Sequence, residues 1–132
     1  MTRIATAVLA LVFATALLGC PAEKKAEVAP QVPATAAAPA DEAKTKFETL
    51  CATCHGTTGL GDGPAAAALD PKPRSYSDAE WQTSVTDEHI AKVIVEGGAA
   101  AGKSPLMPAN PDLKDKPEVV KELVKIIRSY KK

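Results

Sequence analysis

The chain has 132 residues, enough for one small domain with accessory segments. Sixteen Lys and Arg balance sixteen Asp and Glu, so the formal net charge is zero at pH 7. This balance argues against nucleic-acid binding, which relies on a basic excess. Only two Phe, two Tyr and one Trp are present, so a small domain built from this chain needs a further source of apolar core.

Residues 1–19 have the pattern of an export signal. Arg3 gives a short positive start, and residues 4–18 form an uncharged apolar run. The run is shorter than the ~20 residues that a membrane-spanning helix normally needs. The pattern therefore predicts a signal peptide rather than a spanning helix.

The signal ends in Leu17-Leu18-Gly19-Cys20, which resembles the lipobox of bacterial lipoproteins. The resemblance implies cleavage before Cys20 and attachment of lipid to its sulfur and its new amino group. More than one acyl chain makes membrane anchoring stable. The alternative is an ordinary signal peptide with a stray cysteine, although a free thiol is a liability in an oxidising compartment.

Residues 20–40 are predicted to be a tether. The segment is rich in proline and alanine and lacks apolar periodicity, so it has no face to bury. As a flexible coil it would reach roughly 25 Å. The folded domain is expected to be residues 41–132, and its first helix is predicted from an apolar stripe at Ala43, Phe47, Leu50 and Cys51.

This first helix runs into Cys51-Ala52-Thr53-Cys54-His55, a C-x-x-C-H motif typical of c-type haem attachment. Two thiols one helical turn apart can add to the two vinyl groups of one porphyrin edge, and the following histidine can then bind the iron. A thioredoxin-like pair or half of a zinc site are the alternatives. The first needs a βαβ context, and the second needs more ligands than Cys20 and His89 can add.

A glycine-rich stretch follows the motif. Four glycines are spaced closely and end at a proline, in the order Gly56, Gly59, Gly61, Gly63 and Pro64. We expect an irregular loop whose glycines let the backbone pass close to a flat cofactor. Phosphate binding is a weak alternative, since no strand precedes the loop and no G-K-[ST] follows it.

Two further helices are predicted after an extended proline-rich segment at residues 70–74. Residues 77–80 (Ser-Asp-Ala-Glu) form a capping-box pattern before a short helix that carries Trp81. Thr86 is predicted to cap the next helix, which ends at Gly97-Gly98. Its buried stripe is expected to be Ile90, Val93 and Ile94.

Met107 is a candidate metal ligand. Apart from Met1 it is the sole methionine, and it lies beside Pro108 in a proline-rich loop at residues 99–113. A thioether in a stiff loop is well placed to be a soft sixth ligand to iron. His89 and Lys103 are the rival sixth ligands, although a solvated helix histidine is the favoured interpretation of His89.

The last helix is predicted to begin near Asp115, with Glu118 completing a capping box and Pro117 in the first turn. Its main apolar stripe is Val120, Leu123, Val124 and Ile127.

Taken together, residues 41–132 resemble a class I cytochrome c domain of the short bacterial kind. The resemblance is carried by Cys51–Gly56, Gly61–Pro64, the helix over residues 86–98, and Met107-Pro108. It implies an all-α fold in which the first and last helices cross and one covalently attached haem c lies between them. It also implies that His55 and Met107 are the axial ligands and that the carbonyl of Pro64 accepts a hydrogen bond from His55. Trp81 is expected near the haem edge or a propionate.

The resulting functional prediction is a membrane-tethered one-electron carrier on the periplasmic side, held by lipidated Cys20 and exchanging electrons with redox proteins or membrane electron-transfer complexes. If His55 and Met107 fill both axial positions, no site stays open for substrate, so no enzymatic activity is expected. A dihaem peroxidase would need a second C-x-x-C-H, which the chain lacks. The alternatives are a ligand-binding haem sensor and an electron-entry subunit of a larger redox enzyme.

Overall fold

The computed structural model describes residues 38–132. The predicted signal peptide, Cys20 and residues 20–37 of the predicted tether lie outside the described residues. The described part contains helices and no strand, which confirms the all-α prediction. Its elements are α1 (Pro39–Lys46), η1 (Phe47–Cys51), α2 (Ala52–His55), η2 (Ala66–Ala68), α3 (Ala79–Ser84), α4 (Asp87–Ala100), η3 (Pro111–Leu113) and α5 (Pro117–Ser129).

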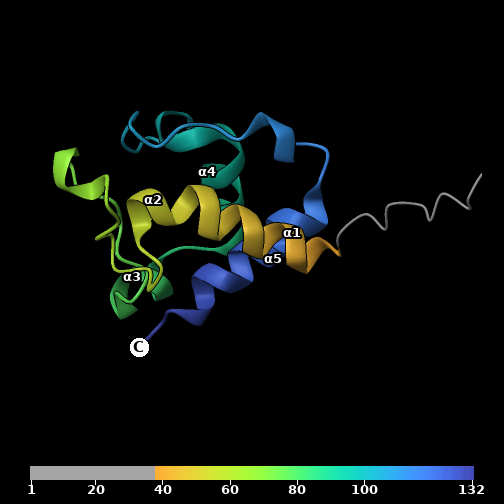
Figure 1. The fold of residues 1–132 in the computed structure, drawn as a ribbon, viewed down its shortest axis with the longest axis horizontal. Helices are drawn as coiled ribbons and strands as arrows, with labels where there is room; N and C mark the ends of the chain where they lie inside the picture. The colour runs from red at the N-terminus through yellow and green to blue at the C-terminus, as the bar shows by residue number, and fades with distance from the viewer. Residues whose placement is uncertain (1–37) are drawn as a thin grey trace, which may run out of the picture. The chain divides into compact units, whose positions relative to one another are not determined.

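The core lies where α1 packs against α5, the helix pair with the most extensive contact. Figure 1 shows α1, η1 and α2 as one continuous helical segment, with α5 beside its N-terminal part. Leu123 of α5 is 1% exposed in this core, and Leu113 of η3, also 1% exposed, belongs to the same cluster of buried side chains. The pairing of first and last helices is therefore the one that the family resemblance implies.

The first helix changes its register just before the C-x-x-C-H motif. Residues 47–51 form a π-turn, in which the amide of Ala52 donates to the carbonyl of Phe47, five residues earlier. A π-turn adds one residue to the turn and rotates everything after it. The buried stripe consequently runs from Phe47 to Ala52, which is 5% exposed, while Leu50 is 48% exposed. The prediction that Leu50 belongs to the buried stripe was wrong, because it assumed an unbroken α-helical period.

The helix boundaries differ from the predictions where capping decides them. α1 begins at Pro39, two residues before the predicted domain boundary, because proline is well suited to the first helical position. Asp78, not Ser77, caps α3 and accepts from the amide of Trp81 at 3.0 Å. α5 begins at Pro117 without any side-chain cap, so the predicted capping box with Glu118 does not form.

The predicted cap of α4 and the predicted buried face of α5 are confirmed. Thr86 caps α4 by accepting from the amide of His89 at 3.2 Å. The regular helix breaks at Gly97, whose φ is 82°. The whole predicted stripe of α5 is buried, whereas in α4 Val93 is only half-buried beside the buried Ile90 and Ile94.

None of the helices in residues 38–132 has the length and apolar character that a membrane-spanning helix needs.

Candidate functional site

The functional site is a crevice on the α2 and α4 side of the domain. Its larger part has a volume of about 940 Å³ and its smaller part about 210 Å³. His55 and Met107 line both parts. Two residues that are 52 positions apart in the sequence, and that the sequence predicts as an axial pair, therefore face the same space.

The two thiols of the C-x-x-C-H motif line the smaller part of the crevice. Cys51 and Cys54 lie there with Leu50, Leu106 and Met107. The π-turn rotates Leu50 out of the core stripe that Phe47 occupies and leaves Cys51 half-buried between that core and the crevice. Burial raises the pKa of the Cys51 thiol, with Lys46 opposing the shift, so this thiol stays protonated at neutral pH.

The imidazole of His55 is held on its far side by the protein backbone. Its Nδ1 donates to the carbonyl of Arg74 at 3.0 Å, and its ring stacks on Tyr76 with 4.6 Å between ring centroids. The other nitrogen, Nε2, is thereby left for a metal. Burial lowers the pKa of His55, while the Arg74 carbonyl opposes the shift. The ring is therefore neutral at pH 7, which is the form that binds metals.

The prediction that Pro64 supplies the carbonyl for His55 was wrong. Pro64 is exposed, because the amides on either side of it bind the carbonyls of the haem-motif turn. Gly63 donates to the carbonyl of Cys54 at 3.1 Å, and Ala65 donates to that of Thr53 at 2.9 Å. These two bonds hold the loop against the flank of α2. The extended segment that contains Arg74, rather than Pro64, therefore lies beside the imidazole and accepts its hydrogen bond.

The glycine-rich loop packs against protein rather than lining the crevice, contrary to the prediction. A Cβ on Gly63 would lie 2.4 Å from the carbonyl oxygen of Ala52, and one on Gly61 would lie 2.3 Å from that of Pro73. None of the four loop glycines is among the crevice-lining residues. They bring α2 and the segment that carries Arg74 close together, and so position His55 indirectly.

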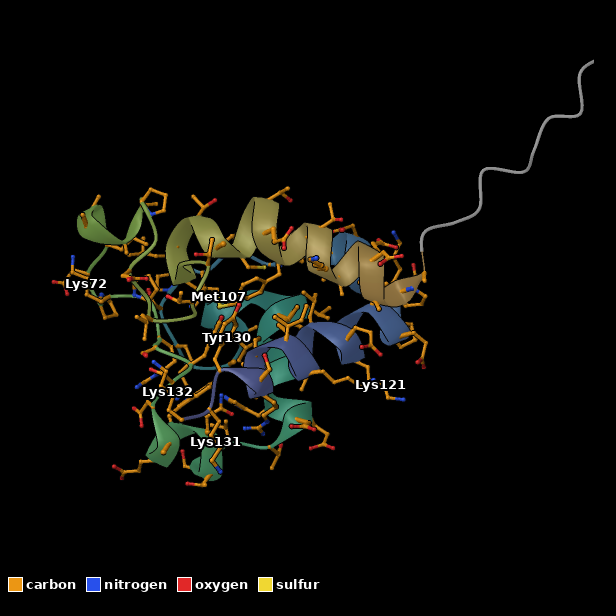
Figure 2. All side chains as sticks on the ribbon, turned by 60° about the horizontal axis from the view of Figure 1, so that its bottom comes forward. Lys72, Met107, Lys121, Tyr130, Lys131 and Lys132 are labelled. Atoms are coloured by element: carbon orange, nitrogen blue, oxygen red, sulfur yellow. The ribbon has the colours of Figure 1, made fainter. Side chains whose placement is uncertain are left out.

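Met107 is positioned by contacts with the end of α4 (Figure 2). The amide of Gly98 donates to the Met107 carbonyl at 3.0 Å, and the amide of Lys103 donates to the Gly98 carbonyl at 2.7 Å. A Cβ on Gly98 would lie 2.1 Å from the carbonyl oxygen of Ser104. Asn110 closes the loop by donating its side-chain amide to the Ile94 carbonyl at 2.7 Å.

The remaining predicted residues line the larger part of the crevice. Trp81, His89 and Lys103 all lie on its wall. His89 is half-buried there, and the interpretation of it as a helix histidine without a ligand role stays a prediction. Its position follows from the helical period, because Val93, four residues later on the same face of α4, lines the same wall.

Sequence reasoning missed Tyr76, Arg74 and Gln82. Tyr76 is 5% exposed and stacks on both His55 and Trp81. Gln82 is 4% exposed and binds the carbonyl of Tyr76. A single aromatic residue in an extended segment and a single glutamine in a short helix are part of no recognisable sequence motif, so neither could be identified from the sequence. Only the folded chain brings them to His55.

Among residues 38–132, no group of three or more His, Cys, Asp or Glu side chains is gathered to hold a metal ion. The donors that face the smaller part of the crevice are instead His55, Met107 and two thiols spaced for one porphyrin edge. The crevice wall is mostly apolar, and its volume suits a flat macrocycle. The residues present therefore fit covalently attached haem, and the fold and site define a small all-α c-type haem protein.

Comparison with known proteins agrees with this class. Residues 40–130 match the family described as cytochrome c. The chain is also similar to a solved structure titled "KustC0563 c-type cytochrome", with 36% sequence identity and a TM-score of 0.51, covering 68% of this chain and 96% of that one. A search of the curated proteins gave no match.

The chain belongs to the cytochrome c family. Covalently attached haem c is the cofactor of that family, and Cys51, Cys54 and His55 fit its attachment motif. Haem-based electron transfer is the function that family membership supports.

Proposed function

We propose that this protein is a one-electron carrier in which Cys51 and Cys54 hold haem c and in which His55 and Met107 are its axial ligands. The observation that carries the proposal is the convergence of these four side chains on one crevice, although Met107 comes from a separate loop. When bound, haem c supplies a ferric/ferrous couple.

Each residue of the proposed site has a physical role. The hydrogen bond from His55 Nδ1 to the Arg74 carbonyl fixes the tautomer and makes the imidazole a more basic ligand. The thioether of Met107 favours ferrous iron and raises the reduction potential. The apolar crevice wall excludes water and disfavours the extra charge of ferric iron in the same direction.

We further propose that the domain acts on the periplasmic side of a membrane, tethered through lipidated Cys20. The lipobox-like Leu17–Cys20 supports the lipid, and the proline- and alanine-rich segment supports the tether. The tether would concentrate the domain near membrane electron-transfer complexes and other redox partners. Mass spectrometry of the mature N-terminus tests this, because an unmodified Cys20 would contradict it.

The second candidate function is a ligand-binding haem sensor in which Met107 gives way. It is favoured by one observation: His89 and Lys103 line the same crevice as Met107 and offer nitrogen ligands.

The visible spectrum decides between the candidates. The carrier should show the long-wavelength methionine-to-iron band in its ferric form at neutral pH, and its ferrous form should not bind carbon monoxide. Met107→Ala should abolish the band, permit carbon monoxide binding and lower the reduction potential. Absence of the band in the unaltered protein would contradict Met107 ligation.

A further inference from the structure

The extended segment over residues 74–76, which contacts His55, is itself held by hydrogen bonds along both of its edges. Arg74 accepts from His55 Nδ1, and two residues later the Tyr76 ring stacks on the imidazole. The amide of Tyr76 donates to the carbonyl of Gly59 at 2.6 Å, which attaches one edge of the segment to the glycine-rich loop. The position of the other edge therefore depends on which group donates a hydrogen bond to the Tyr76 carbonyl.

That carbonyl is bound by Gln82, a side chain that is 4% exposed. The Gln82 Nε2 donates to the Tyr76 carbonyl at 2.8 Å and to the Ile127 carbonyl at 2.9 Å. An amide nitrogen carries two hydrogens, so both are used. One side chain thus links the segment beside His55 to the core helix α5.

Arg128 fixes the orientation of that amide. One terminal guanidinium nitrogen donates to Gln82 Oε1 at 2.8 Å and to the Gln82 carbonyl at 2.6 Å, and the second terminal nitrogen donates to the Val85 carbonyl at 2.7 Å. The third nitrogen, Nε, donates to Asp87 at 2.8 Å. Because Oε1 must accept from Arg128, Nε2 must face the two carbonyls. α3 has only six residues and is marginal by itself, so this network also holds the helix that carries Gln82.

We propose that Gln82 is a positioning residue for the axial imidazole and thereby tunes the reduction potential. Through the Tyr76 backbone it holds the Arg74 carbonyl within hydrogen-bond distance of His55 Nδ1. That bond makes the ligand more basic and stabilises ferric iron, so it lowers the potential. The inference rests on the proposed ligation of iron by His55.

The sign of the potential shift separates positioning from mere packing. Gln82→Met has a similar size but loses both amide hydrogens, which frees the Tyr76 carbonyl and weakens the bond from His55 Nδ1. The potential should then shift to a more positive value. Looser packing alone would admit water, stabilise ferric charge and shift the potential to a more negative value. A negative shift or no shift would overturn the proposal.

A vibrational measurement reads the histidine bond directly. In a Met107→Ala background, the ferrous iron–histidine stretching band should move to lower frequency when Gln82→Met is added. Val120→Ala, a core change in α5 away from Gln82, is the control for lost stability and should leave the band in place. If Gln82→Met does not accumulate with haem, Gln82→Asn replaces it, because the shorter amide cannot reach both carbonyls. An unmoved band in the variant that is measured contradicts the proposal.

If the proposed function itself is wrong, the same measurement gives a different result. If His55 does not bind iron, Met107→Ala combined with His89→Ala, which removes the rival histidine, lacks any iron–histidine band, whatever residue occupies position 82.

Discussion

The two sides of the crevice are held in different ways. On the histidine side, the buried His55 is fixed by a backbone carbonyl, a stacked Tyr76 and, behind them, the buried Gln82. On the methionine side, Met107 lies in a largely exposed loop that is attached to α4 mainly by backbone hydrogen bonds and by close contact at Gly98.

This difference predicts unequal stability within one site. Segments with few buried side chains and exposed backbone hydrogen bonds open at lower free energy than core segments. The histidine side is built into the core of α3 and α5, whereas the methionine loop can move while the core stays folded. Loss of the sixth ligand should therefore precede loss of the fifth under mild denaturation.

The largest expected effect comes from removing the covalent links on the histidine side. Cys51→Ala together with Cys54→Ala should abolish haem that co-migrates with the polypeptide under denaturing conditions, because no thioether can form. The single variants should show weaker retention. If haem can be extracted from the unaltered protein with acidified organic solvent, covalent attachment is contradicted.

Phe47→Ala tests the core on which the histidine side depends. Phe47 is 3% exposed, and its replacement should lower the free energy of unfolding by about 3–5 kcal/mol. Leu50→Ala is the matched variant, because an unbroken α-helix would bury both residues. Leu50 is 48% exposed, so denaturant titration should show a clearly smaller loss. A loss for Phe47→Ala as small as that expected for an exposed side chain would contradict its place in the core.

Gly98→Ala acts on the methionine side alone. The added Cβ would collide with the Ser104 carbonyl, so the loop must move away from α4. The methionine-to-iron band should weaken or vanish, while the iron–histidine bond and the global unfolding midpoint change little. Gly102→Ala is the control in the same loop: its φ is positive, at 67°, so alanine strains the backbone there, but nothing lies within 4 Å of its Cβ. A band lost equally in both variants would show that the loop responds to any backbone disturbance, rather than to the contact at Gly98.

The smallest effect is expected from the ion pairs that the first helix makes with residues 112–116, just before α5. Lys46 donates to Asp112 at 2.6 Å, and this hydrogen bond lowers the pKa of Asp112. Its stabilisation is therefore present above the unfolded pKa of about 3.9 and is lost as pH falls through the lower folded pKa. Lys46→Gln should lower the unfolding temperature slightly at pH 7 and less in strong acid.

The matched control is Lys44→Gln, since Lys44 pairs only within the first helical segment, with Glu48 at 4.0 Å. The opposite sign applies at Lys116, because its hydrogen bond to Glu42 raises the pKa of Lys116. That contribution is present below the unfolded pKa of about 10.4 and is lost as pH rises through the folded pKa. A pH-independent effect of Lys46→Gln would contradict the pairing of Lys46 with Asp112.

The sequence by itself determined the chemistry of the site and the class of fold. Cys51, Cys54 and His55 are adjacent, and their spacing is fixed by local helical geometry, so a single sequence is sufficient to identify them. Thr86 and the stripe of α5 were also predicted correctly, because capping and helical periodicity are local properties.

Tertiary structure alone decided what surrounds His55. Whether Pro64 or Arg74 supplies the carbonyl depends on how the glycine-rich loop packs against α2, and the two residues are only ten positions apart. Gln82 reaches the carbonyl of Ile127, 45 residues away. Such contacts depend on backbone placement across several elements, which no local pattern encodes. The exposure of Leu50 was decided in the same way, because a single extra residue in a helical turn changes which side chain faces the core.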